Sequence, residues 1–300
     1  MILVAGEALV DIFPDGSAQP GGSPFNVAIG LARLGCPVAL ATRISDDGHG
    51  ALLRSALERE GVDTSALRPS PRPTPVARVS LAGEGAPSYG FEGLADLDLA
   101  LGSPLDARTT CLHLGSYALV APRSSEALMR SFAGAPGDVL LSLDPNVRPA
   151  MERSMDRWRS AVAGFAARTN LLKVSEEDVR MLAGPEADVD SIAAGWLSDR
   201  CVLVALTRGA LGATLFSRRH GRIDFAAPPV EVVDTVGAGD AFQAALLAGL
   251  SLHRIRSAAA LSRLGAGTLR ILLGDAVKAG AFACTRHGAC PPTRQQLDSL

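Results

Sequence analysis

Short apolar runs alternate along the chain with longer segments in which apolar residues recur at helical spacing. The runs predict strands buried on both faces, and the longer segments predict helices. Gly35 and Gly61 follow two of these segments, where a glycine commonly ends a helix. The expected strands cover residues 2–5, 38–42, 110–114, 139–143, 171–174, 201–206, 213–216 and 222–225, and the expected helices cover residues 26–34, 49–60, 123–132, 155–167 and 189–198.

This alternation predicts an α/β protein with a central, mostly parallel sheet and helices on both faces. Two segments interrupt it. Residues 11–22 are rich in Pro and Gly, and residues 72–91 contain a stretch from Val76 to Leu81 that alternates as a strand does. We expect them to form a small antiparallel β patch outside the main sheet; loops with one hairpin are the alternative. With no repeat or long linker, the simplest organisation is one domain over residues 1–300.

Composition narrows the class of protein. A chain of 300 residues with 47% hydrophobic residues and a net charge of −2 is typical of a folded globular protein and lacks the basic excess of a nucleic-acid binder. The five cysteines are scattered, which indicates reduced thiols and no zinc site. The N-terminal stretch carries Glu7 and Asp11 and no basic leader, and no apolar run is long enough for a membrane span. We therefore expect a cytoplasmic protein with no nucleic-acid or membrane partner.

The candidate chemistry lies in the stretch VDTVGAGDAF at residues 233–242. It predicts a short strand over residues 230–233, a glycine-rich turn and a helix to Leu250. Gly237 and Gly239 would let the backbone approach a ligand at a helix N-terminus, which favours an anion. Asp240 could accept a proton from an attacking alcohol. A plain capped turn remains open, whereas a dinucleotide-binding turn is disfavoured because Phe242 stands where its last glycine is needed.

The DTVGAGD stretch resembles the C-terminal signature of the PfkB (ribokinase-like) sugar kinases, and residues 21–35, GGSPFNVAIGLARLG, resemble the N-terminal signature. The chain is similar to the fructokinase-like members in six further blocks that occur in order along it. The resemblance implies a ribokinase-like fold, with the β patch as a lid formed by segments at approximately 11–22 and 72–96. The six blocks cover residues 6–14, 61–65, 113–120, 142–149, 173–178 and 207–214.

The implied activity is transfer of the γ-phosphoryl group of ATP to a primary hydroxyl of a small sugar, with fructose as the preferred acceptor. Within the family, 2-keto-3-deoxygluconate, ribose and nucleosides are alternative acceptors. A non-catalytic sugar-binding regulatory protein is a hypothesis of another class, but it predicts loss of Asp240 or the glycines, which are present. A nicotinamide oxidoreductase is disfavoured because no GxGxxG follows the first strand.

The resemblance also implies roles on the sugar side of the site. Asp240 would be the catalytic base, and Gly237, Ala238 and Gly239 would form the anion hole for the transferred phosphoryl group. Without the resemblance, Asp11 could be a solvated turn residue, Asn26 a helix N-cap and Arg148 a surface arginine. The residues that would bind the sugar are Asp11, Gly21, Gly22, Asn26 and Arg148.

On the nucleotide side, the resemblance implies ATP contacts from Lys173, Thr207, Gly209 and Gly239, with a closing strand and loop near the adenine over residues 283–291. Mg²⁺ is expected with ATP. Asp178 is a candidate to hold Mg²⁺ through water, and Asp234 matches a position near a monovalent-cation site, so potassium is a further candidate cofactor.

Two departures from the family pattern concern the sugar pocket. Gln243 replaces an Asn that is common in fructokinase-like members, and Leu94 stands where a Thr is common in the lid. Both bear more on the choice of sugar than on the kinase assignment. Val76 and Leu81 also suggest a homodimer formed through the lid, if the outer face of the lid is apolar.

Overall fold

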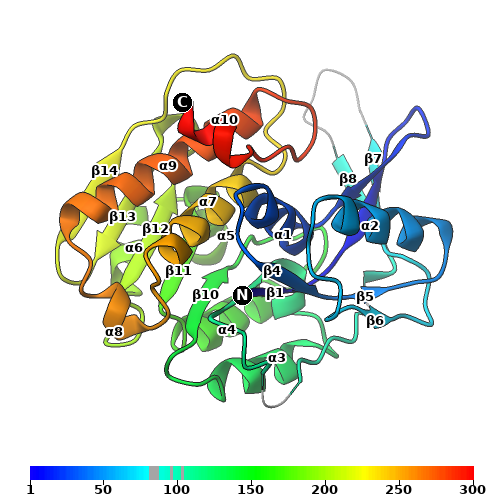
Figure 1. The fold of residues 1–300 in the computed structure, drawn as a ribbon, viewed down its shortest axis with the longest axis horizontal. Coiled ribbons are helices and arrows are strands. Elements are labelled where there is room, and N and C mark those ends of the chain that lie inside the picture. The colour runs from blue at the N-terminus through cyan, green and yellow to red at the C-terminus, as the bar shows by residue number, and fades with distance from the viewer. Residues whose placement is uncertain (81–87, 95–96, 103–104) are drawn as a thin grey trace.

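The computed structural model describes residues 1–80, 88–94, 97–102 and 105–300. An eight-stranded sheet forms its centre, in the order β14-β13-β12-β11-β10-β9-β1-β4 (Figure 1). The strands from β4 to β12 in that order pair in parallel, and β13 and β14 are antiparallel at one edge. These strands are β1 (Ile2–Ala5), β4 (Val38–Ala41), β9 (Cys111–Gly115), β10 (Leu140–Asp144), β11 (Leu171–Ser175), β12 (Leu203–Thr207), β13 (Ala213–Ser217) and β14 (Gly221–Phe225).

Helices cover both faces of this sheet, as the alternation of strands and helices predicted. Alternate residues of β1 enter two separate cores: Ile2 and Val4 pack with α1, α7 and α9, whereas Leu3 and Ala5 pack with α3, α4, α5 and α6. The helices are α1 (Ser23–Arg33), α2 (Gly48–Arg59), α3 (Ser125–Ala133), α4 (Met155–Ala166), α5 (Glu176–Ala183), α6 (Val189–Gly195), α7 (Ala238–Leu252), α8 (Ala258–Leu261), α9 (Ala266–Cys284) and α10 (Arg294–Asp298), with short 3₁₀ turns η2 (Ser116–Leu119) and η3 (Gly209–Leu211).

A second, four-stranded sheet stands beside the main one and confirms the predicted β patch. Its order is β3-β2-β7-β8; β2–β3 and β7–β8 are antiparallel, but β2 and β7, at its centre, pair in parallel. We call it the small sheet. Its strands are β2 (Leu9–Ile12), β3 (Ala18–Gly21), β7 (Val76–Ser80) and β8 (Ser88–Glu92), and a separate pair joins β5 (Arg43–Ile44) to β6 (Arg68–Pro69).

The small sheet bears on the dimer hypothesis. Val76 is buried in the protein's own core, so its side chain is not part of an exposed apolar patch. Leu81 lies outside the described residues, as do residues 95 and 96 of the expected lid segment. A homodimer through this sheet therefore stays a prediction.

Two expected strands are absent from the described structure. Residues 230–233 form no strand, because Val230, Val232 and Val233 are exposed and find no neighbouring strand. Residues 283 and 284 end α9, and residues 285–291 continue as a loop rather than a strand. The sequence analysis also missed α5 and α9. In α9, the residues Leu269, Leu272, Leu273 and Val277 follow helical spacing, which was a usable signal.

Candidate active site

The candidate site lies where the parallel strands of the main sheet end. Asp144 closes β10, Ser175 closes β11 and Thr207 closes β12, and α7 begins beside them. Ligands of open α/β sheets bind outside the carboxyl ends of the strands, because the loops there can converge on one point. Of the residues expected from sequence to carry the chemistry, Thr207 and Asp240 lie at this end of the sheet.

Asp240 lies in the first turn of α7 and is 8% exposed. Ser23 Oγ donates to its Oδ1 at 2.7 Å, and Asn26 Nδ2 donates to its Oδ2 at 2.8 Å. Burial raises the pKa of Asp240, while these hydrogen bonds and the charges of Lys173 and Arg148 act in the opposite direction. The result is a buried carboxyl group held in a fixed orientation, as a general base requires.

Both partners of Asp240 belong to the start of α1. The alternative role of Asn26, as the cap of this helix, does not hold: Gly22 is the N-cap, and Asn26 lies inside α1 with its amide directed at Asp240. Gly22 adopts φ 102°, a conformation that other residues rarely take. Ser23 was missed by the sequence analysis, although its place between the paired glycines and Asn26 in GGSPFN was a usable signal.

Asp11 lies on β2 of the small sheet and faces the N-terminal glycines. A Cβ atom at Gly21 would lie only 2.4 Å from Asp11 Oδ2, so the glycine leaves room for the carboxylate. Burial raises the pKa of Asp11 to about 6. Asp11 is therefore a half-buried carboxyl group held beside Gly21 by the small sheet, rather than a solvated turn residue.

The glycine turn takes the predicted form at the N-terminus of α7. Gly237 is the N-cap with φ 74°, and a Cβ there would lie 2.6 Å from the Cβ of Ala289, in the loop over residues 285–291. The first N–H groups of a helix lack intrahelical acceptors and favour an anion. The N–H of Ala238 already donates to the Thr235 carbonyl at 3.3 Å, so Gly237 and Gly239 are the better placed donors.

Lys173 is not at an open strand end. Its Nζ lies 2.8 Å from Asp144 Oδ2, and both side chains are almost fully buried. Burial opposes the charge on Lys173, but the charges of Asp144 and Asp178 outweigh it and raise the pKa of the lysine. Burial also raises the pKa of Asp144, to about 6. At neutral pH both groups are therefore ionised.

The carboxylates of Asp178 and Asp234 accept hydrogen bonds from backbone N–H groups. Asp178 Oδ1 accepts from the Val147 N–H at 2.8 Å, and its Oδ2 accepts from Ser175 in a capping box at the start of α5. Asp234 accepts from the N–H groups of Val236 and Gly288. In the part of the chain that the structure describes, no three His, Cys, Asp or Glu side chains form a metal cluster.

The remaining predicted residues lie at the rim. Arg148 is exposed, and its guanidinium donates to the Val147 carbonyl at 2.9 Å. Thr207 ends β12, and Gly209 begins η3 with an exposed backbone. No described contact joins these three to Asp240 directly, although the charge of Arg148 reaches it.

A buried polar group lies beneath Asp240. Gln243 Nε2 donates to Ser142 Oγ at 2.8 Å and lies 3.4 Å from His113 Nδ1, which is 3.1 Å from the same hydroxyl. Burial lowers the pKa of His113 to about 3, and the charge of Lys173 adds to this effect. His113 is therefore neutral, and Gln243 joins α7 to β9 and β10.

Helix α1 also reaches the far side of the site. Arg33, its last residue, binds Glu60 with two hydrogen bonds of 2.7 Å and donates to the Pro291 carbonyl at 3.1 Å. Gly288, in the same loop, lies against the small sheet, since a Cβ there would be 2.9 Å from Gln19 Oε1. The loop over residues 285–291 is thus held by α1, by Asp234 and by the small sheet.

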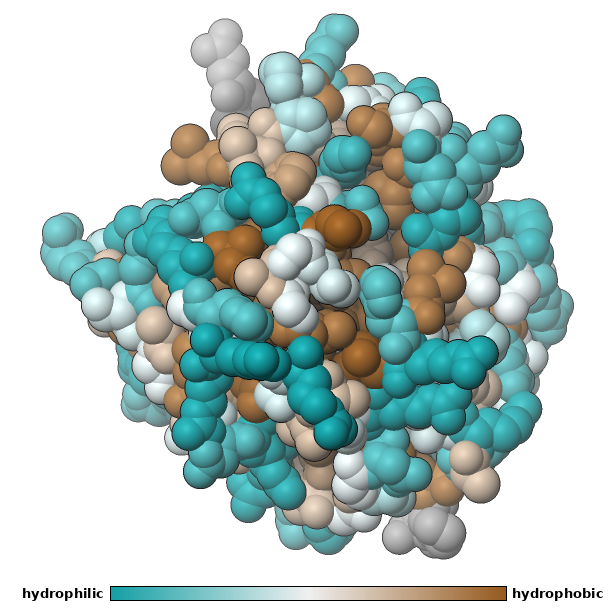
Figure 2. Space-filling model, turned by 60° about the vertical axis from the view of Figure 1, so that its left-hand side comes forward, coloured by the Kyte–Doolittle hydropathy of each residue, from teal (hydrophilic) through white to brown (hydrophobic). Residues whose placement is uncertain are grey.

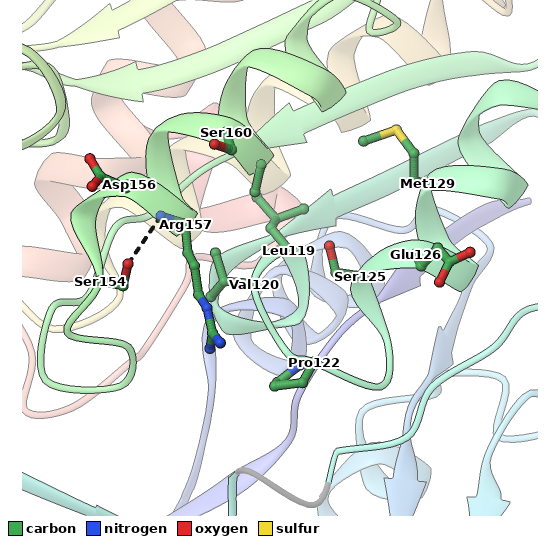
Figure 3. Close-up of a pocket in the computed structure, with 11 residues that line it drawn as sticks. Leu119, Val120, Pro122, Ser125, Glu126, Met129, Ser154, Asp156, Arg157 and Ser160 are labelled. Carbon is green, nitrogen blue, oxygen red and sulfur yellow. Dashed lines mark hydrogen bonds between the residues drawn. The ribbon is translucent and has the colours of Figure 1, made fainter.

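Another hollow lies away from these residues. A groove of about 580 Å³ is lined by η2, α3 and α4 (Figure 3), with Leu119 and Val120 between Met129 on one side and Arg157 on the other. On the face shown in Figure 2, apolar side chains gather around a central hollow and polar side chains surround them. None of the helices in the described parts of the chain combines the length and the apolar character that a membrane span needs.

Comparison with known proteins agrees with the observed fold. The model of the pfkB family carbohydrate kinases matches residues 5–296. The chain is 34% identical over 282 residues to a fructokinase of Rhizobium leguminosarum bv. trifolii, covering 90% of this chain and 86% of that one. It is similar to a Vibrio cholerae O395 fructokinase double mutant solved with fructose, ADP and potassium ion (TM-score 0.83, 26% identity, 99% and 97% covered).

The fold is also similar to an aminoimidazole riboside kinase from Salmonella enterica, solved with aminoimidazole riboside and an ATP analogue. The TM-score is 0.81 at 28% identity, and the match covers 99% of this chain and 98% of that one.

Proposed function

The chain belongs to the pfkB family of carbohydrate kinases, and we propose that it transfers the γ-phosphoryl group of ATP to a primary hydroxyl of fructose. The observation that carries this proposal is the buried carboxylate of Asp240, oriented by Ser23 and Asn26 at the start of a glycine-rich helix N-terminus. A base and an anion site side by side are the parts that phosphoryl transfer needs.

In the proposed reaction Asp240 accepts the proton of the sugar hydroxyl. The hydroxyl oxygen forms the new bond to the γ-phosphorus, the bond from that phosphorus to the bridging oxygen breaks, and ADP leaves. The N–H groups of Gly237 and Gly239 stabilise the charge that develops on the transferred group. The carboxylate already accepts two hydrogen bonds, which keep it aimed at the reacting hydroxyl while burial makes it a stronger base.

Asp11, Gly21, Gly22 and Asn26 would bind the sugar. Asp11 offers two carboxylate oxygens to neighbouring hydroxyls, and the glycines leave space for the ring to approach. The small sheet holds Asp11 and would act as the lid that keeps water, a competing acceptor, from the phosphoryl group. Arg148 at the rim would contribute a positive charge on the same side.

Thr207, Gly209 and the loop over residues 285–291 would bind ATP. The exposed side chains of Val232 and Val233 support this assignment. The Val233 N–H donates to the Cys284 carbonyl, just before that loop, and exposed apolar side chains can pack against the adenine ring of ATP. Mg²⁺ bound to ATP would neutralise phosphate charge, held mainly by the phosphates, with Asp178 acting through water. We also propose that potassium binds near Asp234 and that the protein is cytoplasmic.

The test is ATP turnover with Mg²⁺ against fructose, ribose, 2-keto-3-deoxygluconate and aminoimidazole riboside, with and without K⁺. We expect selective turnover of fructose. Selective turnover of another acceptor would keep the kinase and overturn the sugar assignment. Binding of fructose with no turnover of any acceptor would favour a regulatory sugar-binding protein instead.

A further inference from the structure

The buried ion pair of Lys173 and Asp144 needs an explanation. The two side chains are 4% and 1% exposed, and their charged atoms are 2.8 Å apart. Burying two charges carries a desolvation cost, and a pair of apolar side chains of similar volume often stabilises a fold equally well. Asp144 Oδ1 is also buried without a hydrogen-bond partner in the described structure. A pair this expensive to bury, directly beneath a reactive site, suggests a role in that site.

Lys173 lies directly behind the glycine turn. A Cβ at Gly239 would be 3.0 Å from Lys173 Nζ, so the ammonium packs against the backbone of the residue that precedes Asp240. Asp144 holds the ammonium from the other side. The ammonium is therefore paired with Asp144 on one side and packs against the glycine turn on the other, near enough to Asp240 for the two charges to interact.

We propose that Lys173 is a positioning residue for phosphoryl transfer: from behind the turn its ammonium supports Gly239 and acts electrostatically on Asp240, while Asp144 holds it in place. This inference rests on the proposed kinase function. A direct contact between Lys173 and ATP would need the ammonium to leave its buried pair, and it is an alternative outcome of the test below.

Other titratable or charged groups act on Lys173 and Asp240 from neighbouring elements. Asp178 faces Lys173 from α5, Asp240 from α7 and neutral His113 from β9, and Arg148 adds positive charge near Asp240. Asp178 is already satisfied by Val147 and Ser175. Removing the charge of Lys173 should therefore raise the pKa of Asp240, and removing the charge of Asp144 should lower it.

Lys173→Met and Asp144→Asn break the same ion pair and provide the test. We expect the acid limb of the kcat profile to move to higher pH in Lys173→Met and to lower pH in Asp144→Asn, by about half a unit or more. We also expect Lys173→Met to lower kcat about 10- to 100-fold at pH 7 with little change in the KM for ATP. Shifts in the same direction, or none, would mean that the pair is merely structural.

A rise in the KM for ATP at unchanged kcat would assign Lys173 to direct nucleotide contact and overturn the proposal. Lys278→Met, at the other lysine of the sequence, is the matched control and should leave the profile unchanged. The variants are compared at temperatures where thermal melting shows each one folded. An Asp144→Asn/Lys173→Met double variant, which leaves no unpaired charge, keeps the test open if one single variant fails to fold.

A readout without turnover separates this proposal from the choice of sugar. With two lysines in the chain, lysine labelled at Nζ gives an NMR signal for Lys173, assigned with Lys278→Met. In the unliganded protein this signal should respond to the ionisation of Asp240, and the response should vanish in Asp240→Asn. A Lys173 signal that ignores Asp240 would overturn the proposal even if the protein phosphorylates fructose.

Discussion

The Asp240 site and the groove between α3 and α4 differ in how deeply their polar groups are buried. The groove is open, and its acidic lining residues Glu126 and Asp156 have side chains that are 86% and 92% exposed. Around Asp240, the carboxyl, hydroxyl, amide and ammonium groups are largely buried and bonded to one another. The Asp240 site is suited to chemistry by its converging buried polar groups and not by its volume. Burial and fixed hydrogen-bond partners change the proton affinity of these groups, whereas the volume of a hollow does not.

The strongest test of this contrast is Asp240→Asn. We expect kcat to fall by about 10³-fold or more, because the amide cannot accept the proton of the sugar hydroxyl. The new amide can still accept from Asn26 and donate to Ser23, so the fold and the binding of sugar and ATP should be kept. Steady-state kinetics and calorimetric titration measure both. Retention of most of kcat would contradict the assignment of the base.

Gly239→Ala tests the turn itself. The added methyl would lie 3.0 Å from Lys173 Nζ, so either the turn or the ammonium must move. We expect kcat to fall about 10- to 100-fold, since one displaced anion-hole donor has an effect of this order. Gly267→Ala in α9 is the matched control, because a Cβ there meets nothing within 4 Å. Equal activity of the two variants would show that the turn does not hold the phosphoryl group.

Asp11 gives a smaller effect with a defined pH dependence. Its pKa is raised to about 6, so it is ionised at neutral pH and gains a proton as the pH falls through that value. A protonated Asp11 can accept fewer hydrogen bonds from the sugar hydroxyls. The KM for the sugar should therefore rise several-fold from pH 7.5 to about pH 5. In Asp11→Asn the KM should be higher, by about tenfold, and no longer follow this titration. An unchanged KM profile in the variant would remove Asp11 from the sugar site.

The smallest effect is expected in the groove. Ser160→Trp would fill part of the space between α3 and α4, on the exposed side of α4. Since no residue of the groove belongs to the proposed site, kcat and both KM values should stay within about twofold of the wild type. A change beyond fivefold in kcat would show that the groove communicates with Asp240 and would weaken the comparison.

The features that the sequence predicts correctly are those whose pattern lies within one short, contiguous segment. The strands of the main sheet and Asp240 were predicted because apolar runs and the GAGD turn are contiguous in the chain. The strand expected at 230–233 failed because an apolar run needs a neighbouring strand, and the sequence does not say which neighbours exist. The partnership of Ser23 and Asn26 with Asp240 spans more than 210 positions, so only the folded structure brings it to view.

Helix α1 has a consequence for how this protein can vary. It orients Asp240 through Ser23 and Asn26 at one end and holds the Pro291 carbonyl through Arg33 at the other. Each added or deleted residue would rotate one end against the other by about 100° and shift it by about 1.5 Å. The length of α1, which is eleven residues, therefore sets the spacing and the relative rotation of the two sides of the site. Substitutions along it can be absorbed by repacking, but a change in its length would release one of the two ends.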